Sequence, residues 1–327
     1  MFTTLEDFVK IGASETCACA VVGNEACDAD SFVSALVTAF CLSRRSGNLN
    51  SPVVQCTAED FFSLKPEVTY LLDLVKLDGL RDCLRYSPIT AGSWTLTDCN
   101  AAPSWLPGEA VTLVIDHHAD QGGNLGRAKK IIEMVASCCT LVAREFYEEL
   151  CPTSKLMLLA VIELDSRNGI GTPLDLEIST KLAHDLSLSR EQSVSLGDRI
   201  AHARDDETFW RSLSAEQQLK MDYKEFGKAG FSTLRIALCV GLAEAVVSRM
   251  CNLRVFAVMA ALPSGERHLL VYSTETELHA KITAAVLPFG GVKSDEVSFP
   301  AYFSFYKIAD YRVTRKTVAP LIVKLLD

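Results

Sequence analysis

The sequence predicts an α/β protein with an N-terminal, mostly parallel sheet flanked by helices and a smaller α+β domain at the C-terminus. A short apolar run at residues 18–23 precedes a polar turn and an apolar helical pattern over residues 32–42. This order of strand, turn and helix is the repeating unit of a parallel sheet. Between residues 187 and 206 the apolar periodicity weakens and charged side chains collect, which predicts a domain boundary.

Further apolar runs predict the remaining elements. In the N-terminal part we expect strands at 53–55, 68–72, 94–97 and 111–115, and helices at 139–150 and 153–164, with Thr153 capping the latter. In the C-terminal part we expect strands at 232–240, 255–262, 268–272 and 298–305, and helices at 242–252, 276–287 and 318–326. We assign residues 1–190 to the first domain, 191–205 to a linker and 206–327 to the second domain.

The composition is that of a globular protein. Of the 327 residues, 49% are hydrophobic and 22% are charged, so each domain can bury an ordinary core. No stretch reaches the roughly 20 apolar residues that span a bilayer, and the acidic N-terminus does not resemble a secretory signal. We therefore expect no membrane partner and a cytoplasmic location, with an organelle as the alternative.

Charge and cysteine content narrow the classes of partner and metal site. The formal net charge of −9 disfavours nucleic acids, which proteins bind by neutralising phosphates with Lys and Arg. A small polyanionic substrate would need a local group of cations. The twelve cysteines include no C-x-x-C pair, so we expect reduced thiols and no cysteine-ligated zinc.

Acidic and imidazole side chains follow several of the predicted strands. Asp28 and Asp30 come after the first strand, Asp98 follows residues 94–97, and Asp116-His117-His118 follows residues 111–115. In open α/β sheets ligands bind beyond the carboxyl ends of the strands, so these side chains should meet at one edge. Each has a structural alternative, since Asp28 or Asp30 could cap a helix and Asp98 could form a turn.

The order and spacing of these residues resemble the four motifs of the DHH phosphoesterase superfamily. The matching segments are Gly23-Asn24-Glu25-Ala26-Cys27-Asp28-Ala29-Asp30-Ser31, Asp98-Cys99-Asn100, Asp116-His117-His118 and Asp165, with Ser137-Cys138-Cys139-Thr140 similar to the small-residue turn after the third motif. The first motif is most similar to eukaryotic exopolyphosphatases and the related prune proteins, because family II inorganic pyrophosphatases have His where Asn24 stands. The C-terminal half resembles the DHHA2 domain, whose phosphate-binding segments match Asp222-Tyr223-Lys224 and Thr314-Arg315-Lys316.

The resemblance implies a centre that holds two divalent cations, Mg²⁺ or Mn²⁺. It places one cation on Asp28 and Asp98 and the other on Asp30, Asp98, His117 and Asp165. The implied catalytic residues are Asp98, His117 and His118, the last as a phosphate ligand or as the acid for the leaving oxygen. Substrate would also contact Asn24, Lys224, Arg315 and Lys316, in a cleft that closes around phosphate.

The function predicted in this way is that of an exopolyphosphatase, which releases terminal orthophosphate from linear polyphosphate. An inorganic pyrophosphatase and a prune-like regulatory protein with weak activity are the alternatives, and a nuclease or dinucleotide phosphodiesterase ranks last. The expected partner is polyphosphate or pyrophosphate, without nucleic acid. The sequence leaves the oligomeric state open.

Overall fold

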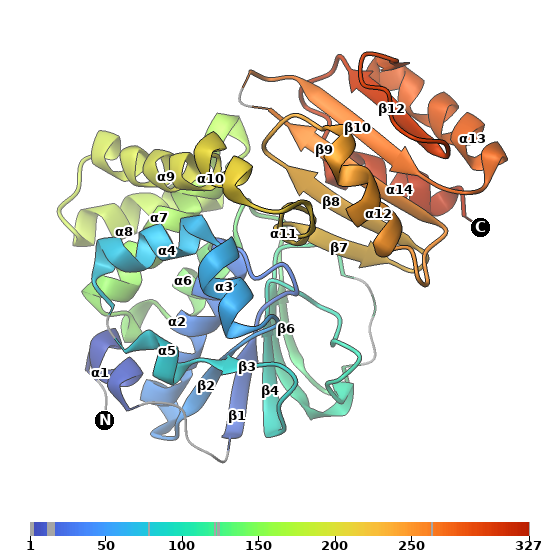
Figure 1. The fold of residues 1–327 in the computed structure, drawn as a ribbon. Coiled ribbons are helices and arrows are strands. Elements are labelled where there is room, and N and C mark those ends of the chain that lie inside the picture. The colour runs from blue at the N-terminus through green and yellow to red at the C-terminus, as the bar shows by residue number, and fades with distance from the viewer. Residues whose placement is uncertain are drawn as a thin grey trace. The chain divides into compact units, whose positions relative to one another are not determined.

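The chain divides into two compact units, residues 1–204 and residues 205–327 (Figure 1). The computed structural model describes residues 3–11, 17–77, 79–120, 122, 125–262 and 264–326. None of the helices in these described ranges has both the length and the apolar character needed to cross a membrane.

The first unit contains a six-stranded sheet in which every pairing is parallel. Its strands are β1 (Cys17–Val22), β2 (Asn50–Val54), β3 (Arg85–Tyr86), β4 (Ala91–Thr97), β5 (Val111–Asp116) and β6 (Lys129–Ile132). They lie in the order β3-β2-β1-β4-β5-β6, with Cys19 of β1 opposite both Asn50 and Ser93. The predicted parallel α/β sheet is therefore confirmed, and β1, β4 and β5 are neighbours.

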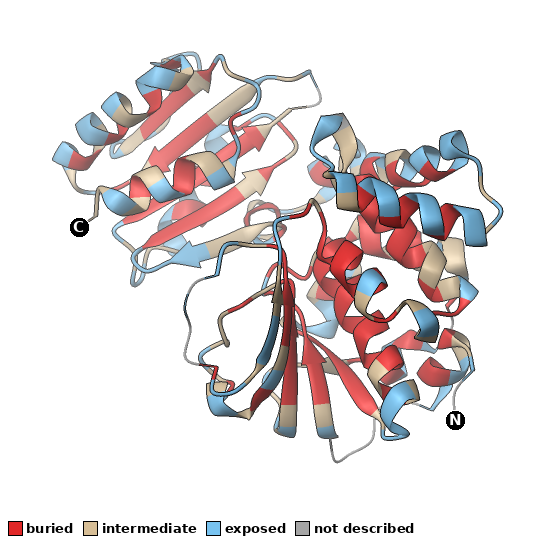
Figure 2. Cartoon of the chain, turned by 180° about the vertical axis from the view of Figure 1, so that it is seen from behind, coloured by how far each residue is buried: buried red, intermediate tan, exposed pale blue. Residues whose placement is uncertain are grey.

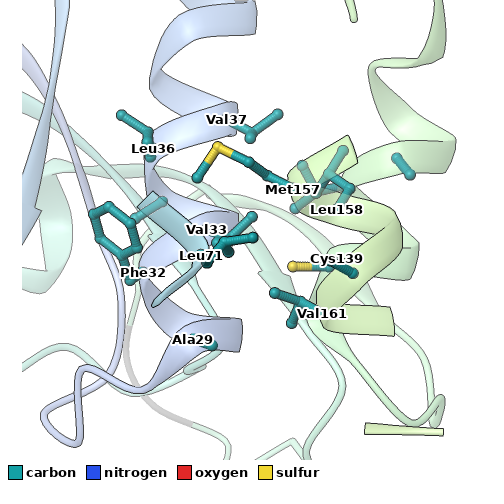
Figure 3. Packing of buried hydrophobic residues seen from close by; sticks show 14 of the residues in the cluster. Ala29, Phe32, Val33, Leu36, Val37, Leu71, Cys139, Met157, Leu158 and Val161 are labelled. Carbon is teal, nitrogen blue, oxygen red and sulfur yellow. The ribbon is translucent and has the colours of Figure 1, made fainter. Parts of the chain in front are cut away.

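Helices gather on one face of this sheet (Figure 1). They are α1 (Leu5–Lys10), α2 (Ala29–Ser46), α3 (Ala58–Leu64), α4 (Pro66–Val75), α5 (Leu80–Cys83), α6 (Cys138–Glu145), α7 (Pro152–Asp165), α8 (Pro173–Asp185) and α9 (Arg190–Arg204), with 3₁₀ turns at Gly108–Ala110, Tyr147–Glu149 and Arg167–Gly169. Figure 3 shows the main core, in which Phe32, Val33, Leu36 and Val37 of α2 lie near Leu71, Cys139, Met157, Leu158 and Val161. On the other face Trp94 packs edge-on against Trp105, at a centroid distance of 5.3 Å.

The structure corrects two expectations about local elements of the first unit. Residues 68–72, which we expected as a strand, lie in helix α4, where Val68 and Leu71 face the core and Pro66 occupies the first turn. A five-residue apolar run does not by itself distinguish a buried strand from a buried helix. Cys151 and not Thr153 is the N-cap residue of α7, because the helix begins at Pro152.

Residues 191–205, which we expected as a linker, are instead almost entirely helix α9 of the first unit. This helix packs against α7 and buries Leu196 and Ile200, while Glu191 and Arg199 are exposed. Gly197 permits the close approach, since a Cβ there would lie 2.6 Å from the carbonyl carbon of Glu163. The weak periodicity arises because a glycine and small residues form much of the contact face.

The second unit contains a mixed six-stranded sheet in the order β11-β12-β10-β9-β8-β7, in which only the β8–β9 pairing is parallel. Its strands are β7 (Tyr223–Phe226), β8 (Ala229–Leu234), β9 (Val255–Ala261), β10 (Arg267–Tyr272), β11 (Gly291–Lys293) and β12 (Phe303–Ile308). Its helices are α10 (Glu207–Ser212), α11 (Ala215–Lys220), α12 (Ala243–Ser248), α13 (Thr276–Val286) and α14 (Arg315–Lys324), with 3₁₀ turns at Val240–Leu242 and Leu287–Phe289. Figure 2 shows that the middle strands are buried while the helices expose one face.

Candidate metal centre

Three loops of the first unit meet at the carboxyl edge of its sheet. Strands β1, β4 and β5 are adjacent and parallel, so the segments that follow them leave the sheet at the same edge. The first carries Asp28 and Asp30, the second begins at Asp98, and the third carries His117 and His118. This arrangement follows the rule that functional groups of an open α/β sheet gather beyond its strand ends.

Asp98 lies at the centre of this group and is almost fully buried, with 3% of its surface exposed. Its backbone has a positive φ of 56°, and its N–H donates to the carbonyl of Ile115 at 2.9 Å. The side-chain Oδ2 accepts a hydrogen bond from Asn24 Nδ2 at 2.5 Å. Among the described residues no group donates a hydrogen bond to the buried Oδ1. His117 Nε2 lies 3.1 Å from that oxygen, outside hydrogen-bond geometry.

The side chain of Asn24 forms hydrogen bonds within the loop after β1 and with Asp98. Its Oδ1 accepts the N–H of Ala26 at 2.9 Å, which fixes the orientation of the amide, and its Nδ2 donates to Asp98. We expected Asn24 to contact substrate. In this structure its amide oxygen accepts one hydrogen bond within the loop, and its Nδ2 positions Asp98.

The N-terminus of α6 holds Asp30. Ser137 Oγ donates to Asp30 Oδ1 at 2.6 Å, the N–H of Cys138 donates to Oδ2 at 2.8 Å, and the N–H of Cys139 donates to Oδ1 at 3.0 Å. The first turn of a helix has unpaired N–H groups and a partial positive charge, so it favours a carboxylate. These three hydrogen bonds fix the orientation of Asp30, with Oδ2 3.6 Å from His117 Nε2.

His117 is oriented by a backbone carbonyl. Its Nδ1 lies 2.9 Å from the oxygen of Val135, and because a carbonyl only accepts, Nδ1 carries the proton. Nε2 therefore faces Asp98 and Asp30. Burial opposes a charge on this imidazole, but the contact with Asp98 and the charge of Asp30 raise the pKa of His117 to about 10.

His118 pairs with the buried Asp116, whose Oδ1 lies 2.8 Å from His118 Nδ1. Asp116 also accepts from Asn100 Nδ2 at 2.6 Å and from the N–H groups of His117 and His118. Burial alone would raise the pKa of Asp116, but the hydrogen bond from His118 holds it below the usual value. An ionised Asp116 keeps the proton on His118 Nδ1, which leaves Nε2 for other contacts.

Asp28 and Asp165 complete the predicted ligand set. Asp28 is the N-cap of α2, where its Oδ1 accepts from the N–H of Ser31 at 3.0 Å. Asp165 ends α7, and burial followed by the charges of Asp30 and Asp28 raises its pKa well above the ordinary value. Burial and the charge of Asp30 likewise raise the pKa of Asp98 to about 7. Four carboxylates thus lie within electrostatic range of one another.

These residues fit a divalent cation. The imidazoles and Asp98 offer one donor atom each within 4.8 Å, and Asp98 Oδ1 is a buried acceptor without a hydrogen bond among the described residues. Carboxylate oxygens with an imidazole nitrogen suit Mg²⁺ or Mn²⁺. A cation would also relieve the repulsion that raises the pKa values of Asp98 and Asp165.

The predicted phosphate-binding cations lie in the second unit. Lys224 is half-buried in β7, and Arg315 and Lys316 occupy the first turn of α14. Arg315 Nη1 donates to both the carbonyl and the Oδ1 of Asp222, each at 2.7 Å. The two segments singled out in the sequence are therefore in contact within this unit.

Sequence reasoning did not predict the groups that orient these ligands. Ser137 lies in the small-residue turn that the resemblance identified and Val135 lies two residues before it, but their contacts with Asp30 and His117 were not expected. Asn100 was noted only as part of a motif. Ser137 begins a helix in a position typical of an N-cap, and this signal could have indicated a carboxylate partner.

The fold and the site together define a class: a two-unit α/β protein with a carboxylate–histidine cluster, suited to a metal ion, at the edge of a parallel sheet. No protein-family profile matches the chain. A Schizosaccharomyces pombe protein named as an exopolyphosphatase is 33% identical over 138 residues, which are 38% of this chain and 35% of that protein. Exopolyphosphatase PRUNE1 of Bos taurus is 28% identical over 262 residues, which are 72% of this chain and 56% of that protein. The chain thus spans about half or less of the length of these relatives.

A crystal structure described as a family II inorganic pyrophosphatase of Methanococcus jannaschii has the same fold. The two chains have a TM-score of 0.64 at 18% identity, with 93% of this chain and 98% of that chain covered. The similarity to proteins named exopolyphosphatase and PRUNE1, together with the shared fold, confirms the predicted resemblance to the DHH phosphoesterase superfamily.

Proposed function

We propose that the chain is a metal-dependent hydrolase of phosphoanhydride bonds that releases terminal orthophosphate from linear polyphosphate. The observation that carries the proposal is the buried Asp98 Oδ1, which accepts no hydrogen bond from any described residue and faces His117 beside Asp30. Such a group of donors is stable when it binds a cation. The names of the relatives support polyphosphate as the substrate class.

The ligand assignment follows the DHH pattern. Asp28 and Asp98 would hold one cation, and Asp30, Asp98, His117 and Asp165 the other. Two bound divalent cations would lower the pKa of a water molecule and offset the charge on the phosphoryl oxygens.

The protein's own residues would orient these groups and the substrate. Asn24 holds Asp98, the first turn of α6 holds Asp30, and Val135 turns the Nε2 of His117 toward both carboxylates. Asp116 accepts from the Nδ1 of His118, and in the imidazolium form of His118 the Nε2–H would donate to a phosphate oxygen or protonate the leaving oxygen.

Binding of a polyanion by a protein of net charge −9 requires local positive charge. We propose that Lys224, Arg315 and Lys316 of the second unit supply it, as the DHHA2 resemblance implies. Cations in the first turn of a helix oppose its dipole, so their presence at the start of α14 favours a role in binding anions.

An inorganic pyrophosphatase is the second candidate, favoured by the fold shared with the Methanococcus jannaschii protein. Phosphate release from pyrophosphate, tripolyphosphate, long polyphosphate and nucleotides, each with Mg²⁺ and with Mn²⁺, separates the two. Faster release from tripolyphosphate and longer chains supports the exopolyphosphatase, and preference for pyrophosphate supports the alternative. Release from none of them with either metal contradicts both.

A further inference from the structure

One short loop positions two of the proposed metal ligands. Residues 135–139 run from the end of β6 into α6. The carbonyl of Val135 binds His117 Nδ1, and Ser137, Cys138 and Cys139 donate three hydrogen bonds to Asp30. A displacement of this loop would therefore move His117 and Asp30 together.

Asp175 binds the chain on both sides of residues 137–139. The carboxylate, which is 1% exposed, accepts from the N–H of Ala136 at 2.9 Å and from Thr140 Oγ1 at 2.5 Å. These two donors bracket the three residues that bind Asp30. Asp175 also accepts from the N–H and the hydroxyl of Thr172, both at 2.8 Å, in the capping box of α8.

The interaction is that of a buried anion with four donors. Burial alone would raise the pKa of Asp175, but the hydrogen bonds from Thr140, Ala136 and Thr172 hold it below the usual value. Hydrogen bonds to an ionised carboxylate are about twice as strong as neutral ones. The role of Asp175 in the capping box of α8 would need only the Thr172 contacts, so the bonds to Ala136 and Thr140 need a separate explanation.

We infer that Asp175 is a positioning residue for the metal centre: it fixes the loop 135–139 so that His117 and Asp30 are presented together. Asp175 itself acts through the loop, without a role as a ligand. The inference rests on the proposed metal-dependent function. Partners that orient metal ligands typically change metal affinity by 10–100-fold, and Asp175 is one contact further away.

The test measures Mn²⁺ binding to the full chain without substrate. The electron paramagnetic resonance signal of free Mn²⁺ reports how much metal remains unbound. We expect Asp175→Asn, which cannot accept at both ends of the loop, to raise the Mn²⁺ Kd about tenfold. Thr140→Val removes the hydroxyl that donates to Asp175 and should also raise the Mn²⁺ Kd. Thr140→Ser keeps that hydroxyl, so its Mn²⁺ Kd should stay close to that of wild type. Thr140→Val also keeps the test available if Asp175→Asn does not fold.

Thr172→Ala is the matched control, because it removes the N-cap of α8 and one donor to Asp175 but leaves both loop contacts intact. It should lower the Tm while the Mn²⁺ Kd stays within twofold of wild type. Unchanged Mn²⁺ affinity in Asp175→Asn and Thr140→Val, or equal weakening in Thr172→Ala, would overturn the inference. Failure of the wild-type protein to bind Mn²⁺ and to hydrolyse phosphoanhydrides would instead overturn the proposed function.

Discussion

At the scale of single residues, the centre is a set of buried carboxylates whose charges are only partly compensated. Asp30 accepts hydrogen bonds from the first turn of α6, whereas Asp98 Oδ1 has no hydrogen bond among the described residues. Asp98 and Asp165 have raised pKa values for the same reason, burial beside other carboxylates. This is the pattern of a site that is completed by a cation.

Replacement of Asp98 by alanine should abolish hydrolysis and weaken metal binding. Asp98 is the proposed bridge, and its loss leaves two close cations with less compensating charge. We expect kcat to fall by more than about 10³-fold, comparable to the loss of a main electrostatic group in other active sites. Phosphate release and Mn²⁺ titration measure the two effects, with the exposed Asp73→Ala of α4 as control. Wild-type turnover at saturating metal would contradict the two-metal assignment.

The metal-free protein should lose stability as the pH rises. Asp98 has a folded-state pKa of about 7 against an ordinary 3.8, and His117 one of about 10 against 6.5. Between pH 4 and 10 the folded state therefore binds more protons than the unfolded state, so the free energy of unfolding falls with rising pH. Bound metal replaces these protons, and its stabilising effect should grow over the same range.

Urea unfolding at pH 6 and pH 9, in EDTA and in Mn²⁺, measures both trends. Asp98→Asn removes one of the two groups and should flatten the slope seen in EDTA. A free energy of unfolding that rises from pH 6 to pH 9 in EDTA would show that Asp98 and His117 do not bind these extra protons in the folded state.

At the scale of elements, close helix packing explains where sequence patterns were misread. The contact face of α9 contains Gly197, whose missing side chain admits the backbone of α7 at Glu163. An apolar stripe was therefore weak over residues 191–205, and a helix was taken for a linker. In α4 the apolar pattern is too dense and not too weak, because a continuous apolar run in a short helix resembles a buried strand.

Gly197→Ala should destabilise the first unit. Alanine normally stabilises a helix interior by about 1 kcal/mol relative to glycine. Here its Cβ would lie 2.6–2.9 Å from backbone atoms of Glu163 and Leu164, and such overpacking costs about 1–3 kcal/mol. We expect a net loss, measured as a lower urea midpoint, while the exposed Ser195→Ala on the same helix leaves it unchanged. A higher midpoint for Gly197→Ala would contradict the packing argument.

At the scale of the whole molecule, the two units carry complementary chemistry. The first collects carboxylates and imidazoles suited to a metal, and the second carries the cations proposed to bind phosphate. Such a division separates metal affinity from substrate affinity, so substitutions in each unit should affect different measurements.

Arg315→Ala should reduce kcat/KM and leave metal affinity intact. Charge-assisted contacts to phosphate are strong, so we expect a loss of about 2–4 kcal/mol, roughly 30- to 1000-fold. Arg315 also joins α14 to β7 through Asp222, and Asp222→Asn is the control for that structural role. Kinetics, calorimetry with Mn²⁺ and the Tm are measured together. If kcat/KM, metal affinity and Tm all fell in both variants, Arg315 would be structural.

The sequence by itself determined the class of the site. A turn after a buried strand must leave a parallel sheet at its carboxyl edge, so Asp28, Asp30, Asp98 and His117 could be assigned to one place from local pattern alone. The resemblance to DHH phosphoesterases added Asp165 and the phosphate-binding segments of the second domain. These features depend on the order and spacing of short motifs along the chain, which can be read directly from the sequence.

The tertiary structure alone decided how each ligand is held. Asn24 binds Asp98 across 74 residues of sequence, and Ser137 binds Asp30 across 107. Asp175 meets Thr140 because α8 packs on α6, and no local pattern encodes that contact. Propensity and periodicity describe neighbours along the chain, whereas hydrogen bonds to buried carboxylates depend on which elements meet in space.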